Sequence, residues 1–322
     1  MPDGSLHAPI NRAPAMTAWL DSQDLRGVLR RNEPMARHCS WRAGGAAELF
    51  FEPADREDLL AFLRAVPADM PLMFVGLGSN LLVRDGGLAG AVVLTARALG
   101  GIRQEGDCFV VEAGVPCAKL ARQVALSGHA GAEWFVGIPG TVGGALAMNA
   151  GAFGGETWET VTQVETVDRR GTTYLRDPKA WQVGYRSVQG PQEEWFLACT
   201  FRFPPGATPE AALAEGRDML ARRNESQPTG VASCGSVFRN PPGDHAGRLI
   251  EAAGLKGARE GGCHVSLKHA NFIINDREAS AADIERLILR VQAEVLARFG
   301  VRLVPEVRIE GRATVNGTGA PA

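Results

Sequence analysis

Apolar residues recur in short runs over the first third of the chain, separated by one helical stripe. Such runs predict strands at residues 47–51, 73–75, 81–83, 91–94 and 109–111. Asp55 is placed as a helix N-cap, with Asp58 three residues further on and apolar residues at helical spacing behind them. This order of strands and helix predicts a small α/β unit over the first hundred residues.

The middle of the chain predicts a helix followed by antiparallel strands. Pro116 opens the helix and Gly128 ends it. Residues 161–175 predict a hairpin that turns at 168–171, and residues 195–203 predict a further strand. The Pro-Pro-Gly sequence at 204–206 is typical of a linker, so we expect a domain boundary there.

The last third of the chain predicts helices over 209–223 and 246–253, a strand over 271–274 and a final strand over 301–309. Ser280 and Asp283 have the spacing of a capping box at the start of a long helix, which Gly300 ends. Its apolar stripe, which runs to Phe299, predicts a core-facing helix.

These patterns divide the chain into three units of mixed α/β and α+β character. We expect the first unit over 1–95, with the C-terminal strand 301–310 returning to it, the second over 96–206, and the third over 207–300. Residues 1–15 and 311–322 are expected to be tails.

Composition and charge exclude several classes of protein. The chain has 322 residues and a net charge of −2, which argues against a nucleic-acid or membrane-surface role because either needs a basic footprint. No signal peptide is visible, and no lysine follows a glycine, so a Walker A loop is excluded. The uncharged stretch 134–155 is long enough to span a membrane, but its seven glycines and Pro139 make such a helix improbable.

The cysteines give no sign of disulfide, metal or thiol chemistry. None of the six belongs to a C-x-x-C pair, which favours free buried thiols in a reducing cytosol. Cys234 has no histidine near it in the sequence, as a thiol nucleophile would require. Cys263, His264 and His269 fit no standard zinc spacing, and a fourth ligand is missing, so we expect no metal.

Two glycine-rich segments are candidates for ligand binding. Residues 76–80 (GLGSN) follow a predicted strand, and glycines there let backbone N–H groups approach an anion closely. A tight turn between strands is the alternative. The segment is not a Rossmann fingerprint, because Leu81 stands where a third glycine is needed and no helix follows.

The second segment is the uncharged stretch 134–155, which concentrates seven of the 39 glycines. It could line a flat or extended ligand with backbone, or it could be a packed loop that threads between domains. A loop this long without charge usually has a function. Two anion-type segments on separate strands suggest a dinucleotide whose diphosphate rests on backbone amides.

At this point a resemblance becomes specific. The two segments resemble the cofactor motifs of flavoenzymes with an FAD domain of the vanillyl-alcohol-oxidase (PCMH) type. Later motifs follow in order: YRS at 185–187, GSVFRNP at 235–241, AGLKG at 253–257, HANF at 269–272 and PEVR at 305–308. Together they resemble the UDP-N-acetylenolpyruvoylglucosamine reductase family from about residue 38 to residue 310.

The resemblance implies an FAD-binding domain in two subdomains plus a C-terminal α+β substrate domain. It implies a cytoplasmic, FAD-containing and NADPH-dependent oxidoreductase of cell-wall peptidoglycan synthesis, which converts UDP-N-acetylglucosamine enolpyruvate to UDP-N-acetylmuramate. NADPH reduces the FAD and leaves, and the substrate then enters the same site. Partners are expected to be small molecules only, with neither nucleic acid nor membrane, and the chain is expected to be a monomer or weak oligomer.

The resemblance also assigns roles to residues. It makes Ser236 the proton donor and gives Arg186 and Glu306 the stabilisation of the charged intermediate, roles that suit a positioned donor and a fixed arginine with a hydrogen-bonding carboxyl group. The implied cofactor-binding residues are Gly76, Gly78, Ser79, Asn80, Leu81, Ile138, Pro139, Gly140, Thr141, Gly143, Gly144, Asn149 and Gly151. The implied substrate-binding residues are Tyr185, Arg239, Asn240 and Arg308.

Departures from the family pattern are small. Ser40 stands where a threonine is commoner, and Cys234 where a smaller residue is usual. Ser236 lies 50 residues after Arg186, a spacing that resembles the compact branch of the family, which lacks an extra loop over the substrate. Two alternatives remain at this level: another FAD-dependent oxidoreductase or oxidase on the same scaffold, and a non-catalytic nucleotide-binding module.

Overall fold

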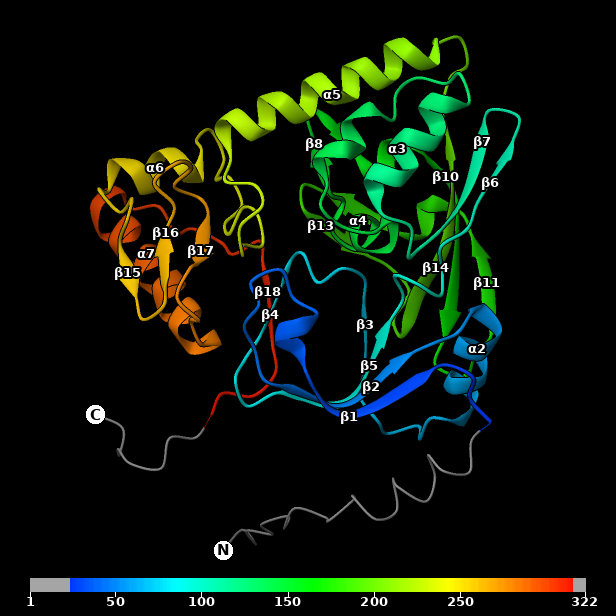
Figure 1. Cartoon of the computed structure of the whole chain (residues 1–322), viewed down its shortest axis with the longest axis horizontal. Coiled ribbons are helices and arrows are strands. Elements are labelled where there is room, and N and C mark those ends of the chain that lie inside the picture. Colours follow the sequence, from blue (N-terminus) through cyan, green and yellow to red (C-terminus); the bar gives the residue numbers. More distant parts are fainter. Residues whose placement is uncertain (1–23, 315–322) are drawn as a thin grey trace, which may run out of the picture.

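The structure is a computed structural model that describes residues 24–314. The tail expected over 1–15 lies outside the described residues, as does most of the tail expected over 311–322. The chain forms three parts, which Figure 1 shows at the lower right, the upper right and the left.

The first part is a four-stranded sheet with one helix against it. Its strand order is β1-β2-β5-β3, in which β5 is parallel to both of its neighbours. The capping expected of Asp55 is confirmed, because its side chain accepts a hydrogen bond from the Asp58 N–H at 3.0 Å. The elements are β1 (Val28–Pro34), η1 (Met35–Arg37), β2 (Ala46–Glu52), α2 (Arg56–Ala65), β3 (Leu72–Val75), β4 (Leu81–Val83) and β5 (Leu88–Leu94).

Strand β1 was not predicted from the sequence. It has the sequence VLRRNEP, and Glu33 is its only buried residue. It pairs with β2 alone and so forms the edge of the sheet. An edge strand can carry polar side chains on both faces, which removes the alternation that would predict it.

The second part is a five-stranded antiparallel sheet of order β11-β10-β14-β7-β6. The hairpin turn expected at 168–171 is confirmed, because the Gly171 N–H donates to the Asp168 carbonyl at 3.0 Å. The elements are β6 (Ile102–Glu105), β7 (Cys108–Glu112), α3 (Cys117–Leu126), η2 (Glu133–Gly137), α4 (Val142–Met148), β8 (Gly151–Ala152), β9 (Gly155–Glu156), η3 (Thr157–Thr160), β10 (Val161–Asp168), β11 (Thr173–Arg176), η4 (Pro178–Ala180), β12 (Gln182–Gly184), β13 (Ser187–Gln189) and β14 (Glu194–Arg202).

The expectation of a continuous loop over 134–155 was wrong, because η2, α4 and the short β8–β9 hairpin occupy most of it. Gly143 lies inside α4 because the helix packs closely on the neighbouring chain: a Cβ there would lie 2.9 Å from the Ala113 Cβ. Close backbone packing therefore explains a glycine that the sequence alone associates with a loop.

The third part is a helical unit with a small three-stranded sheet, β15-β16-β17. The capping box of Ser280 and Asp283 is present, and Gly300 ends α7 with φ +69°. The stripe of α7 is buried as expected except at Phe299, which is 40% exposed in the last turn. The elements are α5 (Pro209–Ser226), α6 (Ala246–Ala252), β15 (Arg259–Glu260), β16 (Cys263–Val265), β17 (Ile273–Asn275), α7 (Ala281–Phe299) and β18 (Arg308–Glu310).

The C-terminal strand is shorter than the expected 301–310. Only β18 is a strand, and it pairs in parallel with β4 of the first part, so the segment does return there. Residues before it form one isolated bridge, between Phe238 and Pro305. Pro305 has no N–H to donate, which limits regular pairing at that point. The domain boundaries as a whole stay a prediction.

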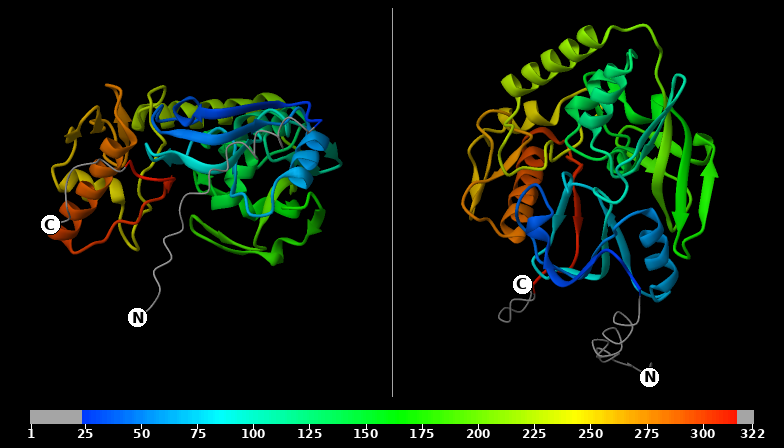
Figure 2. Two further views of the ribbon diagram at one scale, coloured as in Figure 1. Left: turned by 90° about the horizontal axis from the view of Figure 1, so that it is seen from below. Right: turned by 45° about the vertical axis from the view of Figure 1, so that its right-hand side comes forward.

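The first and third parts are joined by polar contacts as well as by β18. The Trp41 indole donates to the Ile273 carbonyl at 2.8 Å, and the Asn275 amide donates to the Trp41 carbonyl at 2.8 Å. The Asp85 carboxylate accepts hydrogen bonds from the first two N–H groups of α7, at 3.0 and 2.9 Å. The three parts therefore pack around a common centre, as the right-hand view of Figure 2 shows.

Candidate active site

Two adjoining cavities lie where the three parts meet. The first, of about 650 Å³, is lined by the loop after β3, the segment that follows η2, the C-terminal end of α5, the loop 234–236 and Glu306. The second, of about 760 Å³, extends toward η1. Ser79, Pro139, Arg223, Gly235 and Phe272 line both cavities, so the two are continuous.

The loop 76–80 presents backbone donors at this junction. Among the described residues, no acceptor meets any of its five N–H groups. Gly78 has φ +60°, and a Cβ there would lie 1.8 Å from the His38 carbonyl oxygen, so only glycine fits. The Ser40 N–H donates to the Gly78 carbonyl at 3.0 Å and fixes the loop against the turn after η1. Successive unpaired amides of this kind suit the diphosphate of FAD.

The segment 138–144 lies directly against that loop. A Cβ on Gly76 would meet the Thr141 hydroxyl oxygen at 2.3 Å, and one on Gly140 would lie 3.2 Å from the Ser79 hydroxyl oxygen. Thr141 caps α4, and the N–H groups of Gly140 and Thr141 meet no acceptor in the described part of the chain. The two glycine-rich segments therefore form one surface of backbone donors.

The thirteen predicted cofactor residues are not all on this surface. Five of them line the first cavity: Ser79, Asn80, Ile138, Pro139 and Gly151. Leu81 is buried in β4, and Gly143 packs on Ala113. Neither of these two residues lines a cavity.

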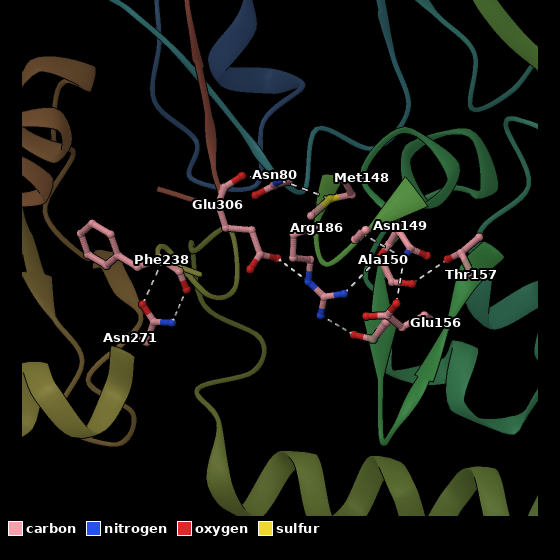
Figure 3. A network of polar contacts seen from close by, with 12 residues as sticks. Asn80, Met148, Asn149, Ala150, Glu156, Thr157, Arg186, Phe238, Asn271 and Glu306 are labelled. Atoms are coloured by element: carbon pink, nitrogen blue, oxygen red, sulfur yellow. Dashed lines mark hydrogen bonds and ion pairs between the residues drawn. The ribbon is translucent and has the colours of Figure 1, made fainter. Parts of the chain in front are cut away.

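Arg186 is anchored by three groups (Figure 3). It lies in the two-residue turn between β12 and β13 with φ +51°, and its terminal nitrogens donate to the carbonyls of Asn149 at 3.0 Å and Gly151 at 2.8 Å. Its Nε is 3.2 Å from Glu306 Oε1; the two form an ion pair, but the buried Nε meets no acceptor in hydrogen-bond geometry. A positive φ in a residue that is not glycine costs energy, which is often found at functional sites.

Asn149 in turn holds the segment that Arg186 binds. It ends α4 with φ +46°, and its side-chain amide donates to Glu156 at 2.8 Å and to the Gly184 carbonyl at 3.2 Å. The predicted cofactor residue Asn149 is 2% exposed and lines neither cavity. Its contacts are those of a residue that positions the Arg186 turn.

Glu306 enters the cavity from the segment before β18. The Asn80 amide donates to the Glu306 carbonyl at 3.1 Å, and the Glu306 N–H donates to the Val237 carbonyl at 2.7 Å. Burial raises the pKa of the Glu306 carboxyl above its ordinary value; the positive charges of Arg186 and Arg239 oppose this rise without cancelling it. The carboxyl group therefore stays protonated to a higher pH than an exposed glutamic acid.

Ser236 lines the first cavity with Arg186 and Glu306. The chain just after it is clamped from two sides. Val237 N–H donates to the Asn271 carbonyl at 2.9 Å, and the Asn271 side chain makes two hydrogen bonds to the backbone of Phe238, at 3.0 and 2.8 Å. Asn271 is 4% exposed, and Figure 3 shows it beside Phe238.

The structure separates the predicted substrate-binding residues from the cavities, because none of the four lines either one. Tyr185 is 48% exposed beneath the Arg186 guanidinium, and Arg308 pairs with Glu310 on β18. The Asn240 side chain accepts from the Ala246 N–H at the start of α6. Of the four, Arg239 is the one whose positive charge acts on the Glu306 carboxyl group, where it opposes the rise in pKa.

The residues of α5 at the first cavity were missed by the sequence analysis. Met219, Arg222 and Arg223 line it, whereas the sequence analysis predicted only that a helix covers 209–223. Arginines on a polar helix face carry no signal that distinguishes a cavity from solvent.

Residues 24–314 hold no group of three or more side chains of the kinds that bind metals. None of their helices is long and apolar enough to cross a bilayer. All six cysteines are free, and burial raises the pKa values of Cys39, Cys117 and Cys263 to about 12.

Comparison with known proteins first defines the class. The family model described as "FAD binding domain" matches residues 47–175, which include both glycine-rich segments. With the amide surface described above, this makes the protein a flavoprotein and confirms the expected fold class. A second model, the C-terminal domain of UDP-N-acetylenolpyruvoylglucosamine reductase, matches residues 227–310, which include Ser236 and Glu306.

Relatives then give the family. The reductase of that name from Alkalilimnicola ehrlichii is 59% identical over 287 residues, which are 89% of this chain and 96% of the relative; the one from Methylococcus capsulatus is 55% identical and covers 89% and 95%. The crystal structure of the Thermus caldophilus reductase matches with a TM-score of 0.76 and 31% identity, over 88% of this chain and 99% of that one. The chain belongs to the UDP-N-acetylenolpyruvoylglucosamine reductase family.

Proposed function

We propose that the first cavity reduces the enolpyruvyl group of UDP-N-acetylglucosamine enolpyruvate to give UDP-N-acetylmuramate, a step of peptidoglycan synthesis, and that Arg186, Ser236 and Glu306 carry the reaction. The observation that supports these roles most strongly is the 3.2 Å contact between the Arg186 Nε and the Glu306 carboxyl group, both of them partly buried. It lies in the cavity that Ser236 and the amide surface also line.

The amide surface is where FAD would be held. The N–H groups of residues 76–80, with those of Gly140 and Thr141, would receive its diphosphate. When bound, FAD supplies the hydride that it takes from NADPH. Ile138 and Pro139 line the first cavity beside this surface and add no charge to it.

Arg186 is suited to a carboxylate that gains charge. When the terminal vinyl carbon of the substrate gains a hydride, the electron pair of the double bond moves to the adjacent carbon, beside the carboxylate. The Arg186 guanidinium is already fixed by two carbonyls, so it needs no rearrangement to stabilise this charge. Its Nε is buried without a hydrogen-bond acceptor, so its N–H group is available to donate to the substrate.

Glu306 is suited to donating a hydrogen bond to the same charge. A protonated carboxyl group is a donor, and burial raises the pKa of Glu306 toward that form. The Asn80 contact fixes the backbone of Glu306 against the cofactor loop. This contact ties Glu306 to the loop that would hold FAD.

Ser236 completes the reduction. Its hydroxyl gives a proton to the carbon beside the carboxylate, and solvent restores that proton in the next cycle. Serine is a weak acid, but the carbanion-like centre is a strong base, so transfer is downhill once the hydroxyl is within about 2.6–3.2 Å. The clamp on residues 237 and 238 limits the freedom of the adjacent Ser236 backbone.

A cytoplasmic location and a monomeric or weakly associated state complete the proposal. Six free cysteines, five of them buried, suit a reducing compartment. Arg186, Ser236 and Glu306 of a single chain all line the first cavity.

The test is anaerobic turnover of the holoenzyme. We expect NADPH oxidation and product formation in a one-to-one ratio, with a product two hydrogens heavier than the substrate. The same enzyme is then given UDP-N-acetylglucosamine, which lacks the enolpyruvyl group, and no NADPH oxidation beyond the background is expected. Oxidation that requires oxygen and ignores the enolpyruvyl group would indicate an oxidase and contradict the proposal.

A further inference from the structure

The β8–β9 hairpin folds the chain back on the residues that hold Arg186. Its strands pair Gly151 with Glu156 in an antiparallel ladder. The next residue, Thr157, is fully buried and donates to the Ala150 carbonyl twice, through its N–H at 3.0 Å and through its hydroxyl at 2.6 Å. The returning chain therefore fixes the backbone whose carbonyls Arg186 binds, as Figure 3 shows.

Glu156 extends this support to the Asn149 side chain. Its carboxylate accepts a hydrogen bond from the Asn149 amide nitrogen at 2.8 Å, and the same nitrogen donates to the Gly184 carbonyl at 3.2 Å. The Asn149 side-chain oxygen accepts from the Trp158 N–H at 3.2 Å. An amide nitrogen carries two hydrogens, so both donors of this buried side chain are used.

These contacts reach Arg186 by two routes. Gly184 ends β12 two residues before Arg186, so the Asn149 amide holds the turn that carries the arginine. The Asn149 carbonyl accepts from one terminal guanidinium nitrogen at 3.0 Å, and the Gly151 carbonyl accepts from the other at 2.8 Å. Both the turn and the guanidinium of Arg186 therefore depend on residues that Glu156 bonds to or pairs with.

The chemistry of a carboxylate suits this place. A carboxylate accepts hydrogen bonds and cannot donate one, so Glu156 requires the nitrogen end of the Asn149 amide. A turned-over amide would place its oxygen against both the Glu156 carboxylate and the Gly184 carbonyl, and both contacts would repel. The packing is also close, because a Cβ on Gly151 would lie 3.2 Å from Glu156 Cγ and 3.2 Å from a guanidinium nitrogen of Arg186.

We propose that Glu156 is a positioning residue for the reduction, which fixes the Arg186 guanidinium through Asn149 without touching a ligand. It lines neither cavity, as an indirect role requires. The inference rests on the proposed function, in which Arg186 stabilises the charge that the substrate gains with the hydride. Flavin reduction by NADPH places no such charge beside Arg186. Loss of the Glu156 contact should therefore slow reoxidation of the flavin and leave its reduction unchanged.

The test measures both half-reactions of the Glu156→Ala holoenzyme by anaerobic stopped-flow. We expect reoxidation by UDP-N-acetylglucosamine enolpyruvate to slow about 10–100-fold, since a displacement of about 1 Å at a reacting centre can cost about 10²-fold. Flavin reduction by NADPH and FAD content should stay within about twofold of wild type. Glu159→Ala is the matched control and should match wild type in both steps. Glu159 is an exposed residue of η3 whose carboxylate accepts from the Glu156 N–H, at 3.1 Å, and not from Asn149.

Two conservative variants separate the hydrogen bond from the charge. Glu156→Gln keeps an acceptor oxygen at the same reach, so reoxidation should recover to within about fivefold of wild type, the remainder reflecting the weaker bond of a neutral acceptor. Glu156→Asp keeps the charge but is one methylene shorter, so it should resemble Glu156→Ala, and it carries the test if the alanine variant does not fold. An active aspartate variant beside an impaired glutamine variant would assign the effect to charge and overturn the inference.

A double variant tests whether Glu156 acts through Arg186. In Arg186→Lys, the added Glu156→Ala change should slow reoxidation by no more than about twofold, because the group that Glu156 positions is already lost. Multiplication of the two single effects would show that Glu156 acts by another route and would overturn the inference.

The remaining outcomes also decide the matter. Equal slowing of both half-reactions in Glu156→Ala, or similar slowing in Glu159→Ala, would indicate a general structural role and overturn the inference. Unimpaired reoxidation in Glu156→Ala together with slow reoxidation in Arg186→Lys would overturn the inference alone. Unimpaired reoxidation in Arg186→Lys would contradict the proposed role of Arg186, and the inference would fail with it.

Discussion

The two sides of the first cavity are built in different ways. On the side of residues 76–80 and 138–144, the backbone presents the donors, and glycines let two chain segments approach each other closely. On the other side lie the side chains of Arg186, Ser236 and Glu306. Backbone carbonyls hold the Arg186 guanidinium, Asn80 holds the Glu306 carbonyl, and Asn271 holds the chain two residues after Ser236. We therefore expect the main chain to bind the cofactor and the side chains to carry the reaction.

This difference teaches what kind of change each side tolerates. The backbone surface should be sensitive to any added Cβ, whatever its chemistry. The side-chain surface should be sensitive to chemistry, even when shape is kept. The predictions below test that division, beginning with the change expected to have the greatest effect.

The backbone side is tested by Gly78→Ala with Gly106→Ala as its control. The two glycines have nearly the same φ, +60° and +62°, but a Cβ on Gly78 meets the His38 carbonyl oxygen at 1.8 Å while one on Gly106 meets nothing within 4 Å. We expect Gly78→Ala to purify without FAD, and Gly106→Ala to keep it at a cost of about 1 kcal/mol in stability. The ratio of flavin absorbance to protein measures the outcome. Equal FAD content in the two variants would contradict the proposal that the backbone amides of residues 76–80 hold FAD.

The side-chain side is tested by Arg186→Lys. Lysine keeps the charge but cannot hold both carbonyls and face Glu306, so we expect the rate of flavin reoxidation by substrate to fall about 10²–10³-fold. FAD content should stay near that of wild type. Arg176→Lys is the control, because Arg176 also pairs with a glutamate and lies over a tyrosine ring, but outside both cavities. Similar losses in the two variants would show that the effect is not specific to the cavity.

The protonation of Glu306 gives a smaller effect that depends on pH. Burial raises its pKa, so the donating form is present at low pH and is lost as pH rises through that raised pKa. The reoxidation rate should therefore decline with increasing pH, by up to about tenfold per unit above the pKa. In Glu306→Gln the amide donates at every pH, and this decline should disappear. A variant that retains the wild-type profile would assign the titration to another group.

The clamp behind Ser236 is tested by Asn271→Ala, the smallest change. The buried Asn271 side chain makes two hydrogen bonds to Phe238, so its loss should cost about 1–3 kcal/mol and lower Tm by several degrees. Reoxidation should slow less than in Arg186→Lys. Asn224→Ala, at an exposed position of α5, should leave Tm within a degree. An unchanged Tm in Asn271→Ala would contradict the claim that Asn271 stabilises the chain after Ser236.

The sequence predicted most of the fold, for physical reasons that differ between elements. The caps at Asp55 and Ser280 and the stripe of α7 are local signals, so they could be recognised without the structure. Strand β1 is polar on both faces, and Pro305 limits the C-terminal strand to β18, so neither followed the simple pattern. Helix α4 was hidden by glycines that its close packing requires.

The residues of the site also differ in how far the sequence could predict them. Gly76 and Gly78 were informative in the sequence because a glycine-rich turn after a strand is uncommon without a reason. The Arg186–Glu306 pair joins distant segments, so its residues could be proposed only from the family resemblance. Arg223 belongs to no such motif, and only the fold shows that its helix ends at the junction of two cavities.

The central claim is that Ser236 protonates the reduced substrate, and anaerobic stopped-flow of Ser236→Ala tests it most directly. We predict that NADPH reduces the bound flavin within about twofold of the wild-type rate, while reoxidation by UDP-N-acetylglucosamine enolpyruvate slows about 10²–10⁴-fold, the usual contribution of a positioned acid. Ser127→Ala, whose hydroxyl bonds within the end of α3, should match wild type in both steps. Equal slowing of the two steps in Ser236→Ala, or unimpaired reoxidation, would contradict the account.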